Sequence, residues 1–228
     1  MLKKASVCLL FCLCLSCESR ETPSTLDVAT VFAGQKAAAF PEMAEIHTRS
    51  TMSIPGIPAM QPTETTIISK GKDKSVVEIK SSVMHIKIVR NDGKVGGVDL
   101  KTGKTLPAQL LASANQGTPD LDKSFGAAND YLAPVKVDSL WRLSPKDPTH
   151  PTLYYSEKNK RIVKMTQSVS GTQSETTFRY CDASCAVPGT PSAIEMVSTA
   201  NGQTTRILTE MTVKKRTDLS DAFFAVPK

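Results

Sequence analysis

Residues 193–208 read Ala-Ile-Glu-Met-Val-Ser-Thr-Ala-Asn-Gly-Gln-Thr-Thr-Arg-Ile-Leu. Two segments rich in strand-forming residues flank Asn201-Gly202, a dipeptide that favours a two-residue hairpin turn because both positions tolerate positive φ. The stretch therefore predicts an antiparallel hairpin with strands over 193–199 and 204–215.

Short strands separated by turn residues continue through most of the chain. A period of two over 44–54 places Ile46 and Met52 on one side of a strand and His47 and Arg49 on the other. The same reasoning predicts further strands at 63–69, 75–80, 83–90, 95–100, 135–143, 153–157, 161–168 and 175–181.

Helical spacing interrupts the strands in three places. Helices are expected at 24–40, with Ser24 or Asp27 as the cap, at 107–115 and at 121–132. Together the elements predict an α+β fold, mainly antiparallel: a half-open curved β-barrel of about nine to eleven strands covered by two or three helices.

The composition excludes several classes of protein. The chain has 228 residues, of which 40% are hydrophobic, so it suits one folded domain and is too apolar to be wholly disordered. A net charge of +6 is mild, and the basic residues over 70–94 lack the interleaved aromatics of single-strand binders. We therefore expect no nucleic-acid partner and a solvated strand face, with anionic lipid headgroups as the alternative contact for these residues.

The first seventeen residues predict an export signal. Lys3 and Lys4 precede an apolar stretch over 5–15, which matches a secretory signal and is too short for a transmembrane helix. Leu15-Ser16-Cys17 resembles a bacterial lipobox, in which the cysteine is acylated, for example with palmitate, and becomes the new N-terminus. An ordinary signal peptide cleaved nearby is the alternative.

These features divide the chain into a lipoprotein signal peptide at 1–16, an acylated tether at 17–23 and a single domain at 24–228. Several acyl chains on Cys17 would anchor the protein firmly in a membrane. The sorting logic of the lipoproteins it resembles makes the outer membrane, facing the periplasm, the expected location, because Glu18 rather than Asp follows the cysteine.

Only Cys181 and Cys185 remain once the signal is removed and Cys17 is acylated. An exported chain lies in an oxidising compartment, so we expect these two to form a local disulfide. Two unpaired thiols are the alternative. A zinc site would need two further ligands, and the three histidines are scattered without ligand spacing.

The sequence offers no catalytic constellation. The segment Gly97–Thr105 ends in Gly-Lys-Thr, but its spacing does not match a phosphate-binding loop. The acidic pair Asp120 and Asp122 lacks the later glycine and glutamate of a calcium loop. We therefore expect no enzymatic activity, no cofactor and no metal.

The order of the elements resembles the lipoprotein-localisation (LolA/LolB-like) family of periplasmic lipoprotein carriers and outer-membrane lipoprotein receptors. The resemblance rests on an N-terminal helix followed by antiparallel strands, on 95–100 before the helical insert, on the hairpin at 193–208 and on the ending Asp-Ala-Phe-Phe-Ala-Val-Pro-Lys at 221–228. The family's early Arg-Pro dipeptide is absent.

In that family the concave face of the sheet holds acyl chains. The resemblance therefore implies an apolar cavity lined by Ile46, Met52, Ile54, Val77, Ile79, Met84, Ile86, Ile88, Val163, Met165, Phe178, Ile194, Met196, Ile207 and Met211. The alternative is that these residues form the core beneath the helices. Two functions follow: lipid or lipoprotein binding in the manner of lipoprotein sorting, or a structural or regulatory envelope lipoprotein that binds a protein partner.

Overall fold

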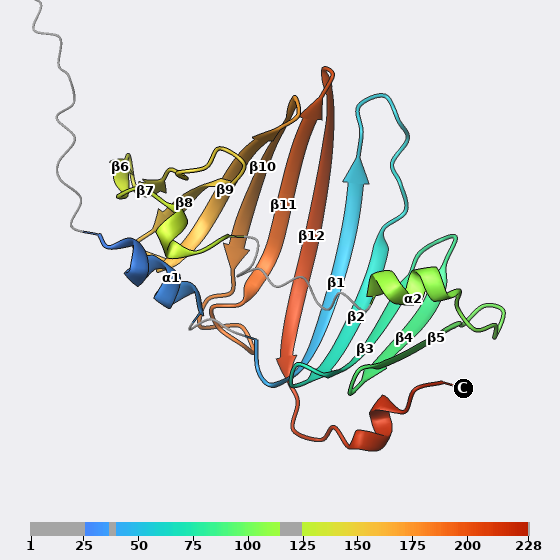
Figure 1. Cartoon of the computed structure of the whole chain (residues 1–228). Helices are drawn as coiled ribbons and strands as arrows, with labels where there is room; N and C mark the ends of the chain where they lie inside the picture. The colour runs from blue at the N-terminus through green and yellow to red at the C-terminus, as the bar shows by residue number, and fades with distance from the viewer. Residues whose placement is uncertain (1–25, 37–39, 115–124, 228) are drawn as a thin grey trace, which may run out of the picture.

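The computed structural model describes residues 26–36, 40–114 and 125–227. These residues form one antiparallel sheet of twelve strands (Figure 1). The strands are β1 (Met43–Ser53), β2 (Thr63–Lys70), β3 (Lys74–Lys80), β4 (His85–Asn91), β5 (Lys94–Asp99), β6 (Val135–Val137), β7 (Leu140–Leu143), β8 (Thr152–Ser156), β9 (Arg161–Val169), β10 (Thr172–Tyr180), β11 (Pro191–Ala200) and β12 (Gln203–Lys215).

The sheet is continuous because the first and last strands of the described chain meet in its middle. Its order is β5-β4-β3-β2-β1-β12-β11-β10-β9-β8-β7-β6. Asn201 and Gly202 connect β11 to β12 with φ of 52° and 75°, the positive values that a two-residue hairpin turn requires. The hairpin expected from the sequence is therefore confirmed, and β12 then pairs along β1.

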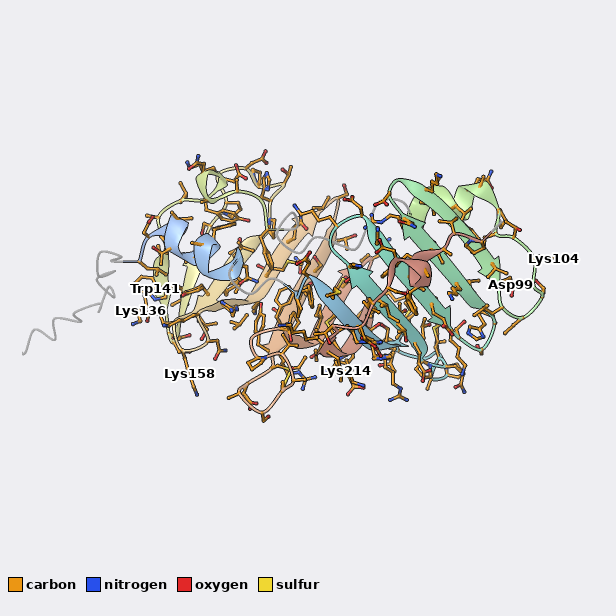
Figure 2. The ribbon with its side chains drawn as sticks, turned by 90° about the horizontal axis from the view of Figure 1, so that it is seen from below. Asp99, Lys104, Lys136, Trp141, Lys158 and Lys214 are labelled. Carbon is orange, nitrogen blue, oxygen red and sulfur yellow. A yellow bond between two sulfur atoms is a disulfide. The ribbon has the colours of Figure 1, made fainter. Side chains whose placement is uncertain are left out.

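Two short helices lie on one side of this sheet. α1 (Val28–Lys36) packs against β9 and against the 3₁₀ turn η1 (Ala128–Asp130), while α2 (Ala108–Ala114) packs against β5. Asp27 caps α1, because its carboxylate accepts a hydrogen bond from the Ala29 N–H at 3.2 Å. Figure 2 shows the sheet curving towards both helices, so we call this side the concave face and the other side the convex face.

Two adjacent glycines allow elements to pack closely on both faces of β5. A Cβ on Gly97 would lie 2.7 Å from the Leu106 side chain just before α2, and a Cβ on Gly96 would lie 2.6 Å from the Val226 side chain. Because successive strand residues point to opposite faces, Gly97 admits the α2 region on the concave face. Gly96 admits the end of the chain on the convex face.

The chain ends in a segment that crosses the convex face, which we call the C-terminal strap (residues 219–227). It contains the 3₁₀ turn η2 (Asp221–Phe224). Leu219 and Phe224 pack against Val76 and Val89 of β3 and β4. Lys70 and Lys74 hold the strap from outside, each with an ion pair to Asp221, at 2.8 and 3.0 Å.

The expected fold class is confirmed, with two corrections to individual elements. The single strand expected at 135–143 is a hairpin of β6 and β7, because Asp138 turns the backbone at φ 53°. The helix expected at 121–132 is wrong over its described part, where only η1 is helical. Gly126 has φ of 72°, which a continuous α-helix does not accommodate. Residues 121–124 lie outside the described residues.

Candidate functional site

The cross-strand register shows which expected lining residues share the concave face. Residues that pair directly across neighbouring strands lie on the same face of a sheet. Starting from Ile88 and Ile86, which pack against Leu106 and Leu111 near α2, the register places twelve of the fifteen candidates on this face: Ile46, Met52, Val77, Ile79, Ile86, Ile88, Met165, Phe178, Ile194, Met196, Ile207 and Met211.

The other three candidates lie elsewhere. Ile54 follows the last residue of β1, and Met84 precedes the first residue of β4. Val163 is skipped where the pairing of β8 and β9 shifts register. It lines a shallow depression with Lys164 and Thr177, which the register places on the convex face.

Both ends of the concave face are covered by packed side chains. At the α1 end, Val31 and Phe125 pack with Trp141, Leu143 and Phe178 in one buried cluster. At the α2 end, Leu106 is buried with Ile86 and Ile88. Phe178, Ile86 and Ile88 therefore belong to the core, which is the alternative role that the sequence allowed for such residues.

Between these covered ends, one row of side chains crosses the concave face from strand to strand. Direct pairing links Met52, Ile207, Met196, Thr176, Met165, Leu153 and Leu143. The row begins at fully buried Leu143 and Leu153, and it ends at Met196 and Met52, which are each 36% exposed. Apolar side chains thus lead from the core under α1 to an accessible part of the face.

A band of hydroxyl groups divides the apolar concave face. Thr48 and Ser50 lie between Ile46 and Met52 on β1, and the Ser50 hydroxyl is 2.9 Å from that of Thr209 on β12. Thr48 and Ser50 were not among the residues expected to line this face, although their even spacing from Ile46 could have identified them. Because the Ser50 and Thr209 hydroxyls satisfy one another, the band interrupts the apolar surface without leaving either group unpaired.

Comparison with solved structures finds proteins of the same architecture. A LolA superfamily protein of Nitrosomonas europaea matches with a TM-score of 0.56 at 16% identity, over 88% of this chain and 98% of its own. A DUF1329 family protein of Desulfovibrio piger gives 0.54 at 10% identity, over 87% and 95%. A domain of Vibrio parahaemolyticus named as an outer membrane lipoprotein-sorting protein gives 0.50 at 12% identity, over 87% and 95%.

This chain has the fold of the LolA superfamily. The resemblance inferred from the order of its elements is thereby confirmed at the level of the fold. No protein-family model matches the sequence, and no curated protein matches it either. Sequence identities this low establish the fold alone. What the concave face binds has to be inferred from the residues that line it.

The structure joins Cys181 and Cys185 in a disulfide, with their Cα atoms 5.6 Å apart. The bond closes a turn that follows β10, in which Gly189 donates a backbone hydrogen bond to the Cys181 carbonyl. Val187 of the same connection packs against the cluster around Ile46 on the concave face. The connection that holds the disulfide therefore packs against the part of the concave face near Ile46. Cys17 lies outside the described residues.

The convex face of the LolA-type sheet carries a network of charges. Glu45 contacts both His47 and Arg216, and His47 also lies 3.0 Å from the Thr66 hydroxyl. His47 and Arg216 hold the pKa of Glu45 below its usual value. Arg216 donates two hydrogen bonds to Asp218, which lowers the pKa of Asp218 to about 2. The network links β1 and β2 to the residues after β12, and it lies on the opposite face from the apolar row.

Titratable groups near the concave face act as structural ties. The Tyr131 hydroxyl donates to the Phe125 carbonyl at 2.6 Å, and burial raises its pKa to about 12. Tyr180 donates to the Ile162 carbonyl at 2.6 Å. Within 26–36, 40–114 and 125–227, no cluster of three potential metal ligands occurs. The helices in these ranges are also too short or too polar to cross a membrane.

Proposed function

We propose that this chain is an envelope lipoprotein, anchored through an acylated Cys17, that holds acyl chains of lipids or lipoproteins on its concave face. The observation that carries the proposal is the apolar row that ends at Met52 and Met196. These two long side chains remain partly exposed although they adjoin a packed core. Their flexible thioethers adapt to chains of different shape.

We propose that the concave face binds acyl chains and does not catalyse a reaction. The row consists of methionine, isoleucine, leucine and one threonine, and none of these side chains acts as an acid or base near neutral pH. Small-molecule sites are concave and lined mainly by apolar side chains, and this row has both features. The expected location is the outer membrane, on the side that faces the periplasm.

A matched pair of substitutions on β11 tests acyl-chain binding. Met196 and Val197 are adjacent and point to opposite faces. We expect Met196→Glu to weaken binding of a fluorescent fatty-acid probe by at least about tenfold, because a carboxylate placed against the acyl chain loses its hydration. Val197→Glu, which adds the same charge on the convex face, should leave the affinity within about twofold.

Native mass spectrometry of the full chain, purified without detergent, supplies an independent measurement. Co-purifying masses of phospholipid or fatty acid are expected. A clean apo mass together with no probe binding would contradict the proposal and favour the alternative, a structural or regulatory lipoprotein that binds a protein partner. Equal losses in both β11 variants would also contradict it, because the concave face would then have no special role.

The anchor is tested separately. Labelled palmitate should be incorporated into the wild-type chain in the producing bacterium and absent from a Cys17→Ser variant. Cys8→Ser, in the apolar stretch of the expected signal peptide and well before the lipobox, is the control and should be labelled normally. Undiminished labelling of the Cys17→Ser variant would contradict acylation at this position.

A further inference from the structure

At one end of the sheet, four connections between strands carry no charge, whereas the two outer connections at that end, 99–105 after β5 and 144–151 between β7 and β8, are charged. The connection from β1 to β2 belongs to a run of fourteen residues, 50–63, without a charged side chain. The turn between β9 and β10 lies within an uncharged run of ten, 165–174, and the turn between β11 and β12 within another of ten, 196–205. The turn between β3 and β4, 81–84, is also uncharged.

Antiparallel pairing brings these four connections to one end of the sheet. β1, β3, β9 and β11 all run towards this end, and β2, β4, β10 and β12 return from it. Figure 1 shows three of the connections together at the top of the view, where the β1–β2 loop rises beside the β11–β12 turn. We call these four connections the uncharged rim.

The uncharged rim exposes large apolar side chains. Ile57 and Met60 in the β1–β2 loop are 51% and 52% exposed, Val83 in the β3–β4 turn is 85% exposed, and Val169 at the end of β9 is 48% exposed. Single exposed apolar residues need no explanation, but four of them on adjoining uncharged loops form the kind of surface that marks an interaction site.

The backbone conformation of the β1–β2 loop keeps its apolar side chains exposed. Pro55, Pro58 and Pro62 restrict its conformations. The Ile57 N–H donates to the Ile54 carbonyl at 3.0 Å, and Gly56 adopts the positive φ of 80° that this turn uses. Ile57 is therefore exposed by a defined turn.

The chemistry of the uncharged rim fits a bilayer better than a protein. Protein interfaces are enriched in aromatic residues, methionine and arginine, and of these only methionine occurs over 50–63, 81–84, 165–174 or 196–205. A surface that enters a bilayer needs apolar tips without charge, and cations set further back towards the headgroups. Lys80 and Lys101 occupy such positions beside the β3–β4 turn, where Lys101 donates to the Ser82 carbonyl at 3.0 Å.

We propose that the uncharged rim is a membrane-contact surface, which inserts Ile57, Met60 and Val83 among the headgroups of a phospholipid bilayer. The rim is continuous with the concave face, because Met52 of the apolar row lies two residues before Ile54, where the β1–β2 loop begins. The contact opens the concave face towards the bilayer. This purpose rests on the proposed function, whereas the contact itself is tested independently of acyl-chain binding.

Brominated lipids measure the contact directly. The full chain is reconstituted into vesicles of phosphatidylethanolamine and phosphatidylglycerol that carry bromine at a known depth of the acyl chains. Tryptophan placed at the rim by Ile57→Trp should shift its emission to the blue and be quenched by the bromine. Trp141, the only native tryptophan, is buried and gives a constant background.

Phe223→Trp is the matched control, because Phe223 is 41% exposed and lies on the C-terminal strap at the opposite end of the strands. It should show neither shift nor quenching beyond the wild-type level. Adding Met60→Asp and Val83→Asp to the Ile57→Trp chain should reduce its quenching several-fold, since charged tips are costly to insert. Quenching that is equal at both tryptophans, absent at Ile57→Trp or unchanged by the two aspartates would overturn the proposal.

The experiments distinguish a failure of the membrane-contact proposal from a failure of the acyl-chain-binding proposal. In solution without vesicles, Met60→Asp and Val83→Asp should leave the affinity for the fatty-acid probe unchanged, whereas Met196→Glu reduces it. Quenching without probe binding would support the membrane contact and contradict acyl-chain holding. Probe binding without quenching would do the reverse.

Discussion

The two ends of the strands differ in what they expose. At the uncharged rim, loops carry isoleucine, methionine and valine outward. At the other end, the turns over 70–74, 91–94 and 157–161 are rich in lysine and aspartate, and the apolar residues of the C-terminal strap point inward. Figure 2, which views the molecule from this charged end, shows Lys158 and Lys214 on the side of the sheet away from the helices. The charged end is closed by packing and ion pairs, while Ile57, Met60 and Val83 of the uncharged rim remain exposed.

The largest expected effect is the loss of the strap's buried anchor. Phe224 is fully buried against Val76 and Val89. Phe224→Ala should lower the free energy of unfolding by about 3–5 kcal/mol, the usual cost of removing a buried phenyl ring. Urea denaturation measures it. Phe223→Ala, a change at the exposed neighbouring ring, should cost less than about 1 kcal/mol. Similar losses in the two variants would show that the strap does not close the charged end.

A smaller effect is expected where the strap approaches β5. Gly96→Ala introduces a Cβ that would lie 2.6 Å from the Val226 side chain and 3.1 Å from the Pro227 carbonyl oxygen. We expect a loss of about 1–3 kcal/mol in unfolding free energy from this overpacking. Val226→Ala removes the clashing methyl groups, so the double variant should recover part of the loss. Additive costs in this double-mutant cycle would contradict the contact.

Local signals in the sequence predicted most strands but not their arrangement. Asn201-Gly202 and the alternation around Ile46 act over a few residues, so the β11–β12 hairpin and β1 could be identified directly. The pairing of Thr48 with Met211 joins residues from the two halves of the chain, and no local pattern encodes it. Asp138 forms a turn without a glycine, which is why β6 and β7 were expected as one strand.

In the candidate site, too, local patterns could be predicted from the sequence and the effects of distant contacts could not. Periodicity grouped the apolar residues of each strand, and the register then placed most of them on one face. Burial could not be inferred, because it depends on what covers each position: Ile86 lies under Leu106, whereas Met196 is partly exposed. The uncharged runs at 50–63 and 196–205 are visible in the sequence, but only the topology brings them to one end.

The ion network of the charged end should make stability depend on pH. The pKa of Asp218 is lowered from 3.8 to about 2, and that of Glu45 is lowered from 4.5. Carboxylates with depressed pKa values stabilise the fold above their unfolded pKa, and this stabilisation is lost as pH falls towards 2. Arg216→Gln should therefore lower the urea midpoint slightly at pH 7 and by less near pH 2, where Asp218 is only partly ionised. Arg49→Gln is the control, because Arg49 and Glu210 form a long, exposed pair at 3.9 Å.

The smallest effect on stability is expected at the uncharged rim, where a small effect would show that the exposed side chains are not part of the core. Ile57 is half exposed in a loop, so Ile57→Asp should change the unfolding free energy by no more than about 0.5 kcal/mol. Urea denaturation of the chain without vesicles measures it, beside Phe224→Ala. A neutral result would show that Ile57 contributes nothing to the folded core, as a side chain available for membrane contact requires. A loss comparable to that of Phe224→Ala would instead place Ile57 in the folded core and remove the contrast between the two ends.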